Sequence, residues 1–184
     1  MQSKNLNKEI MTTVKEKIAR TTTELNGNEF AATLKVLEDA IVSKDGKYGL
    51  QFGDLEGAHD WPLEFDHIAV RTQGLFHYKV MKSEKIGMLS PLGEVYVPCE
   101  MDEICEEMNG VCLLQRDGKL GFFFVNEELY IAPAYDEVES LGLGESIHVR
   151  KGNVWGCFTQ EGDFMTDQEA KDYEDIPLGC VDLL

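Results

Sequence analysis

One nine-residue pattern occurs four times in the chain, and this repetition constrains the fold more than any other feature of the sequence. Each copy begins with Lys or Arg, has a bulky apolar residue at its fifth position and has glycine at its sixth. The copies are KDGKYGLQF from 44, KSEKIGMLS from 82, RDGKLGFFF from 116 and KGNVWGCFT from 151. Their glycines, Gly49, Gly87, Gly121 and Gly156, recur at a period of about 35 residues, which is typical of an array of small units that pack on one another.

A second pattern follows each of the first three glycines at a nearly constant distance. It has a proline, a large apolar residue, an aspartate, one further residue and then Ile or Val, as in WPLEFDHI from 61, VPCEMDEI from 97 and APAYDEV from 132. Its prolines and aspartates are Pro62, Pro98, Pro133, Asp66, Asp102 and Asp136. A fourth version, DYEDI from 172, has lost the proline, as expected of a terminal repeat without a next neighbour. We place this degenerate last repeat at residues 147–176.

Turn signals divide each unit into three short strands. Asp45-Gly46 and Asp117-Gly118, flanked by apolar residues, predict two-residue hairpins. A second turn is marked by Gly57, Gly93, Gly162 and, in the corresponding place of the third unit, Glu128. Each unit therefore consists of a strand, a tight turn, a strand, a glycine turn and a proline-bounded strand that ends near the Asp-x-Ile. We expect an all-β fold of tandem antiparallel β-hairpin repeats in an open solenoid- or propeller-like array, with an N-terminal α-helix.

These patterns resemble those of the bacterial WG-repeat family. The resemblance is carried by KDGKYGL, RDGKLGF and GNVWGCF, each followed by a glycine turn and then by a Pro-x-Tyr-Asp-x-Val element such as PAYDEV, over residues 34–176. Only Trp155 is the tryptophan of the family's name, because Tyr48, Ile86 and Leu120 stand in the other copies. The resemblance implies tandem β-rich repeats, and it supplies no catalytic residues.

The recurring residues are expected to have structural roles. Trp155 occupies the place of Tyr48, so it should be a bulky apolar core residue rather than specifically an indole. Glycine inside a strand marks a bulge or the close approach of another backbone, so Gly156→Val should destabilise the fold more than Trp155→Leu. The aspartates recur once per repeat, which favours a short carboxylate that accepts backbone N–H bonds at a turn over a catalytic group.

The N-terminal region differs from the repeats. In residues 7–20 the apolar side chains recur at helical spacing and basic residues are in excess, so residues 1–28 are expected to form an amphipathic helix. This segment is either a cap on the first repeat, which we favour, or a basic arm for an acidic partner. The repeat domain then covers residues 29–184. Residues 29–42 fit a helix or a strand, and we favour a short helix up to about Lys35 followed by strand.

Charge and cysteine content narrow the class of protein. The formal charge of −17 repels nucleic acid phosphates and anionic lipid surfaces, so we expect no nucleic acid and no membrane partner, whereas a basic protein would be attracted. The start of the chain has no apolar run of signal-peptide length, which favours a cytoplasmic protein. The cysteines are odd in number and include no C-x-x-C pair, which predicts reduced, mostly buried thiols at Cys99, Cys105, Cys112, Cys157 and Cys180.

Sequence signatures of catalysis and of metal or cofactor binding are absent. The chain contains no H-E-x-x-H, no G-x-S-x-G and no G-x-x-x-x-G-K-[ST]. The acidic runs at 100–107 and 161–175 lack the residue order of a calcium loop. The histidines His59, His67, His77 and His148 are scattered, and His67 should be a solvent-facing variant of the position held by Glu103 and Glu137. We therefore predict no enzyme activity, no metal and no cofactor.

Two classes of function remain. We favour a non-enzymatic protein-binding or scaffolding repeat protein whose acidic surface suits a basic protein partner, with neutralisation of a basic toxin as a narrower version. The alternative is a small-molecule or carbohydrate binder, with or without enzyme activity, that has a cleft lined by Trp61, Tyr78, Tyr96 and Tyr130. The sequence leaves open the oligomeric state and the choice between a linear and a propeller-like array.

Overall fold

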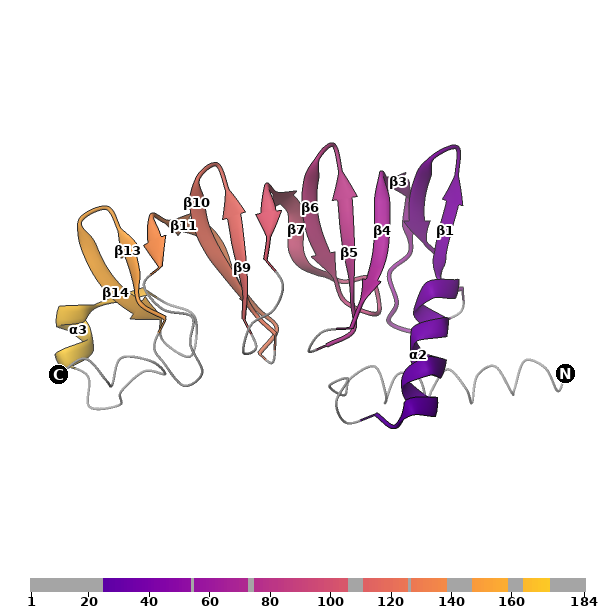
Figure 1. Cartoon of the computed structure of the whole chain (residues 1–184), viewed down its shortest axis with the longest axis horizontal. Helices are drawn as coiled ribbons and strands as arrows, with labels where there is room; N and C mark the ends of the chain where they lie inside the picture. Colours follow the sequence, from indigo (N-terminus) through magenta and orange to yellow (C-terminus); the bar gives the residue numbers. More distant parts are fainter. Residues whose placement is uncertain are drawn as a thin grey trace, which may run out of the picture. The chain divides into compact units, whose positions relative to one another are not determined.

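The computed structural model describes residues 25–53, 55–72, 75–105, 111–125, 127–138, 147–158 and 164–172. Within these residues the chain is mostly β, with four small antiparallel sheets that follow one another in sequence (Figure 1). No described sheet closes on itself. The prediction of successive antiparallel β units with an N-terminal helix is thus confirmed. The helix predicted for residues 7–20 lies outside the described residues.

The chain divides into two compact units, Met1–Glu100 (unit 1) and Met101–Leu184 (unit 2). Unit 1 contains helix α2 (Gly27–Asp39) and a sheet of order β1-β2-β3, made of β1 (Ile41–Lys44), β2 (Lys47–Leu50) and β3 (Trp61–Phe65). Its second sheet has the order β4-β5-β6-β7 and consists of β4 (His67–Arg71), β5 (His77–Lys82), β6 (Lys85–Leu89) and β7 (Val95–Met101), which ends at the unit boundary.

Unit 2 contains two further four-stranded sheets and a short helix. The first has the order β11-β10-β9-β8, with β8 (Glu103–Ile104), β9 (Val111–Arg116), β10 (Lys119–Phe124) and β11 (Leu129–Tyr135). The second has the order β12-β13-β14-β15, with β12 (Glu137–Val138), β13 (Val149–Lys151), β14 (Val154–Phe158) and β15 (Phe164–Thr166). Helix α3 (Asp167–Asp172) follows β15.

The two-residue turns have the backbone that the sequence predicts. Asp45 and Gly46 have φ values of 52° and 77°, and Asp117 and Gly118 have 51° and 72°. Positive φ at both central residues is the signature of the type I′ hairpin turn, whose twist matches that of the flanking strands. Glu128 has a φ of 50°, close to the left-handed region of Gly57 and Gly93, so its assignment as the equivalent of these glycines is confirmed.

The aspartate of the second pattern marks a passage between sheets, which the sequence analysis did not foresee. The third strands end at Phe65, Met101 and Tyr135, directly before the aspartates, as predicted. The chain then continues as β4, β8 or β12, and each of these is the first strand of the following sheet. Every sheet after the first therefore has a fourth strand, which the preceding repeat supplies.

Helix α2 is longer than predicted. The favoured interpretation ended the helix near Lys35, by analogy with the later repeats, but the helix continues to Asp39 and the strand begins only at Ile41. A capping box fixes its start, because the Asn26 side chain accepts from the Glu29 N–H at 3.1 Å while the Glu29 carboxylate accepts from the Asn26 N–H. The burial of Leu37 holds the last turn against the core, and this tertiary contact outweighs the local analogy.

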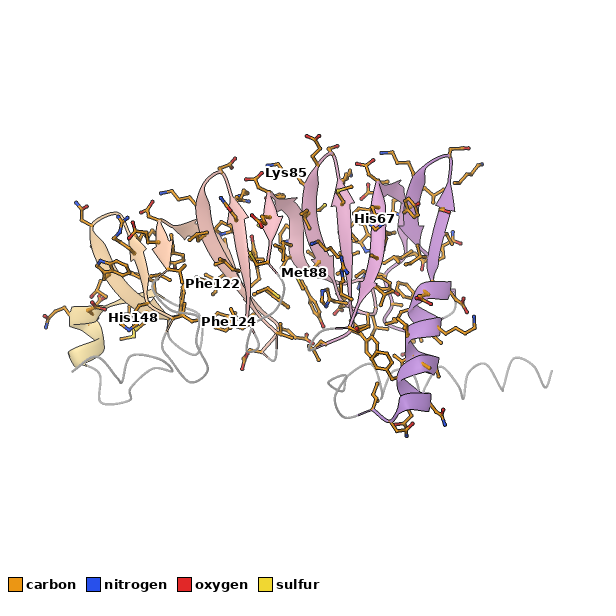
Figure 2. The ribbon with its side chains drawn as sticks, viewed as in Figure 1. His67, Lys85, Met88, Phe122, Phe124 and His148 are labelled. Atoms are coloured by element: carbon orange, nitrogen blue, oxygen red, sulfur yellow. The ribbon has the colours of Figure 1, made fainter. Side chains whose placement is uncertain are left out.

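Each unit has an apolar core. In unit 1, Leu37 of α2 and Leu50 of β2 pack with Phe65, Tyr78 and Val80, all at most 2% exposed. In unit 2, Phe122, Tyr135 and Phe158 form a cluster of aromatic rings with centroids 5.0 to 6.4 Å apart. Figure 2 shows Phe122 and Phe124 on β10. Burial of these side chains is the main stabilising term of such small sheets.

Candidate functional site

The glycine at the sixth position of each repeat lies against the main chain of the third strand of the same repeat. A Cβ atom at Gly49 would lie 2.5 Å from the Trp61 carbonyl oxygen, and one at Gly121 would lie 2.5 Å from that of Ile131. Gly87 meets main-chain atoms of Cys99, and Gly156 meets those of Met165, in the same way. The close backbone approach that the sequence predicted is thus present in all four repeats.

The prolines of the second pattern lie on the strands that make this approach. The pairing register shifts between Tyr48/Phe65 and Leu50/Trp61, and Pro62 lies within the irregular segment. Pro133 lies in the equivalent segment of β11, and Pro98 lies in β7. All three strands are at the edge of their sheets, where a missing N–H removes no ladder bond. In the first three repeats the glycine and the proline thus lie on the two strands of one contact, whereas the fourth repeat has the glycine contact without a proline.

The bulky residues next to the glycines are less buried than predicted. Tyr48, Ile86, Leu120 and Trp155 are half-buried in every repeat, whereas the following glycine is buried. The expectation that Trp155 is a core residue is wrong in this respect, because the position lies only one or two residues from the turn at the end of the hairpin. A half-buried position accepts side chains of different shape, which fits the Tyr, Ile, Leu and Trp found there.

The recurring aspartates bind the turn of the following hairpin. The carboxylate of Asp66 accepts a 2.7 Å bond from the Ser83 N–H, that of Asp102 accepts one from Asp117, and that of Asp136 accepts one from Gly152. The expected role, a carboxylate that accepts backbone N–H bonds at a turn, is present in all three. Asp66 and Asp136 also form ion pairs with Lys47 and Lys119 of the preceding hairpin.

These contacts favour the ionised form of the carboxylates. The pKa of Asp66 lies below its ordinary value because of the hydrogen bond from Lys47 and then that from the Ser83 N–H, while desolvation opposes the shift. The pKa of Asp136 is lowered in the same way, first by Lys119 and then by the Gly152 N–H. Both carboxylates are therefore ionised at neutral pH, the form that accepts hydrogen bonds from the turn and from the lysine.

One edge of each unit carries the two-residue turns, and we call it the tip edge (Figure 1). Its charges are balanced. In unit 1, Lys47 pairs with Asp66, and Lys82 lies 2.9 Å from the Glu64 carboxylate. In unit 2, Arg150 pairs with Glu137 at 2.6 Å. The basic residues of the tip edge are Lys44, Lys47, Lys82 and Lys85 in unit 1 and Arg116, Lys119, Arg150 and Lys151 in unit 2.

The opposite edge, which we call the loop edge, is acidic. In unit 1 it comprises α2 and the segments 51–53, 55–60, 71–72, 75–76 and 90–94. The acidic residues described there are Glu29, Glu38, Asp39, Glu56, Asp60 and Glu94. The described basic residues are Lys35, which pairs with Asp39 at 3.1 Å, and Arg71. The loop edge of unit 2 includes Glu127 and Glu128. In unit 1 the uncompensated negative charge of the described residues thus lies at the loop edge, which net charge alone could not reveal.

The aromatic residues proposed for a ligand cleft differ in burial. Tyr78 is fully buried, and its hydroxyl donates a 3.1 Å bond to the Leu37 carbonyl, so it belongs to the core. Burial raises its pKa. Trp61 is half-buried and donates from Nε1 to the Gly93 carbonyl at 2.7 Å, which links β3 of the first repeat to the β6–β7 loop of the second. Tyr96 and Tyr130 are half-buried on β7 and β11. These four residues belong to four different strands.

The predictions for the histidines and cysteines are confirmed at some residues and wrong at others. His67 is exposed beside Tyr48, with ring centroids 5.9 Å apart, so its solvent-facing position is confirmed (Figure 2). Cys99, Cys105 and Cys112 are free thiols, although Cys105 is exposed. Cys157 is disulfide-bonded, so the expectation of reduced thiols is wrong for this residue. Sequence spacing does not reveal which cysteines meet in space.

Within the parts of the chain that the structure describes, no group of three or more His, Cys, Asp or Glu residues is placed to hold a metal ion. The described helices include none long and apolar enough to cross a membrane.

Comparison with known proteins gives no relative. No family model matches the chain, and neither the curated proteins nor the solved structures contain a match. The resemblance to the WG-repeat family therefore stays a prediction from the motifs.

Proposed function

We propose that the chain is a non-enzymatic protein-binding or scaffolding repeat protein and that the loop edge receives a basic protein partner. The observation that carries the proposal is the separation of charge in unit 1. Lysine and carboxylate side chains neutralise one another at the tip edge, whereas carboxylates predominate at the loop edge. An uncompensated acidic surface attracts a basic partner over a distance of about one Debye length, roughly 8 Å at physiological salt.

The chemistry of the repeat positions supports a scaffold rather than an enzyme. The residues that recur in every unit are occupied in holding strands and turns together, as the contacts of Gly49, Asp66 and Asp136 show. Their carboxylates are held in the ionised form by lysine and by backbone N–H groups. A surface built on such repeats can vary its loops without changing its frame.

The finer architecture belongs to the same proposal. We infer that the repeats form an open array rather than a closed ring. Four repeats of about 35 residues, each with three or four short strands, are few for a closed propeller. Small-angle X-ray scattering of the full chain tests this point. An elongated particle is the expected result, and a compact disc would contradict it.

The binding proposal is tested with two charge-matched variants of the full chain. The loop-edge variant carries Glu38→Gln, Glu56→Gln and Glu94→Gln, and the control carries Asp45→Asn, Glu84→Gln and Asp117→Asn at the tip edge. All six side chains are exposed, and both variants lose the same formal charge. Pull-down from the native host at low and high salt would identify partners. Titration of the purified partner should then show about tenfold weaker binding to the loop-edge variant and little change for the control.

Two results would reject the proposal. If no salt-sensitive partner is recovered, the chain is not a binder of basic proteins. If both variants weaken binding equally, the interaction depends on net charge and not on the loop edge.

A further inference from the structure

We propose that Asp66 couples the two sheets of unit 1, so that they open together rather than one at a time. Its contacts fall on both sheets. The carboxylate pairs with Lys47 on β2 of the first sheet, and it accepts the Ser83 N–H from the β5–β6 turn of the second sheet at 2.7 Å. Its own N–H donates to the Met81 carbonyl on β5 at 2.8 Å.

Asp66 lies at the point where the chain passes from the first sheet to the second, so its contacts can link both sheets. Strand β3 ends at Phe65 and β4 begins at His67, so the chain passes from one sheet to the next through this single residue. Ser83 lies in the two-residue turn beyond the last pair of the β5–β6 ladder, Lys82↔Lys85. Its N–H therefore has no partner in that ladder, and the carboxylate of the neighbouring repeat accepts it.

Another contact at the tip edge also joins the two sheets. Lys82 of the second sheet lies 2.9 Å from Glu64 of the first. Charge-assisted bonds of this kind are stronger than neutral ones, and they link segments whose sequence separation is 17 to 19 residues. Contacts of this kind between neighbouring repeats make a repeat array unfold cooperatively rather than one repeat at a time.

The same set of contacts occurs around Asp136 in unit 2, and this recurrence argues against a chance contact. Asp136 lies between β11 and β12, pairs with Lys119 on β10, accepts the Gly152 N–H at 2.7 Å and donates its own N–H to the Arg150 carbonyl at 2.8 Å. The turn residues that donate to the carboxylates differ, Ser83 and Gly152, but the donated group is the main-chain N–H in both. The aspartate and the lysine are therefore the only side chains that this set of contacts requires, because any turn residue other than proline has a main-chain N–H.

Native-state hydrogen exchange of the full chain tests the coupling. In the unaltered protein the slowest amides of β2 and β5 should exchange through one common opening. In Asp66→Ala the amides of the first sheet should lose on the order of tenfold more protection than those of the second. Lys47→Met removes the contact on the first sheet alone and should separate the two sheets in the same direction. Asp45→Asn, an exposed acid of the same edge, is the control and should leave both sheets unchanged.

Each outcome decides the matter. An equal loss of protection in both sheets would show that Asp66 stabilises the unit without coupling its sheets. No loss of protection would show that the contact does not contribute to stability. Either result overturns the proposal. If Asp66→Ala does not fold, Lys47→Met and the pair Asp136→Ala and Asp117→Asn in unit 2 provide the same comparison. The test is independent of any binding partner.

Discussion

The replacement of Gly156 tests the central position of the repeat, because main-chain atoms occupy the place of its missing side chain. A Cβ atom there would lie 2.8 Å from the Met165 carbonyl carbon and closer still to its oxygen. Real Cβ atoms are essentially never found within 3.0 Å of another heavy atom, so β15 must move away in Gly156→Val. The neighbouring Trp155 is half-buried and faces Arg150 across the strand pair, so leucine can replace it without a clash.

The size of the effect follows from what β15 would lose. Its pairing with β14 covers Gly156↔Thr166, Cys157↔Met165 and Phe158↔Phe164. If the hydrogen bonds of this pairing contribute about 0.5–1.5 kcal/mol each, Gly156→Val costs roughly 2–4 kcal/mol in unfolding free energy. Trp155→Leu removes part of a half-exposed ring and costs about 1 kcal/mol. Since 1 kcal/mol shifts the Tm of a chain of this size by about 2–4 °C, the two variants should differ by several degrees.

Thermal unfolding followed by far-ultraviolet circular dichroism, with urea titration at 25 °C, measures both variants. Gly27→Ala is the matched control, because a Cβ at Gly27 has no atom within 4 Å, and its Tm should be unchanged or slightly raised. Equal midpoints for Gly156→Val and Trp155→Leu, with an unaffected control, would refute the packing argument for the repeat glycine.

Three further changes probe other contacts. The buried Thr33 hydroxyl has no hydrogen-bond partner among the described groups, so Thr33→Val should raise the unfolding free energy by about 1 kcal/mol, measured by urea titration, whereas Thr33→Ser should lower it. Glu84 has a φ of 65° at the position that Gly46 and Gly118 hold in two equivalent turns, so Glu84→Gly should stabilise by about 0.5–1 kcal/mol and Glu84→Ala should not. The pKa of Asp136 is lower in the folded chain than in the unfolded one, so its contribution is present above the unfolded pKa and disappears as pH falls through the folded value. Stability should therefore decrease on acidification below about pH 4, and Asp136→Asn should show a shallower decrease; parallel pH profiles would contradict this assignment.

The features that local chemistry determines could be predicted from the sequence. Asp45-Gly46 and Asp117-Gly118 specify the type I′ turn through their own backbone preferences, and both turns have it. The spacing of the repeats placed Glu128 in a glycine position, and its φ of 50° agrees. The glycines of the repeats predicted a close backbone approach because no other residue tolerates one inside a strand.

The features that depend on distant partners could not be predicted in this way. Strands β8 and β12 are only two residues long, too short for an alternating pattern, and they exist because β9 and β13 pair with them. The end of α2 was predicted by analogy with later repeats. That analogy fails because the described first sheet has three strands and the chain before β1 instead packs Leu37 of α2 into the core.

Comparison of the repeats with one another also indicates where specificity can arise. At the tip edge the same chemistry recurs, with a base before each turn and an aspartate that accepts the next turn's N–H, because every copy must hold its neighbour in one way. At the loop edge the connections differ in length and composition, spanning 51–60 between β2 and β3, 90–94 between β6 and β7 and 125–128 between β10 and β11. Positions under a shared structural constraint stay alike between copies, and positions without one can diverge. The loop edge is therefore the side on which one repeat can differ from the next without loss of the frame, and in unit 1 it is also the side with an excess of described acidic residues over basic ones.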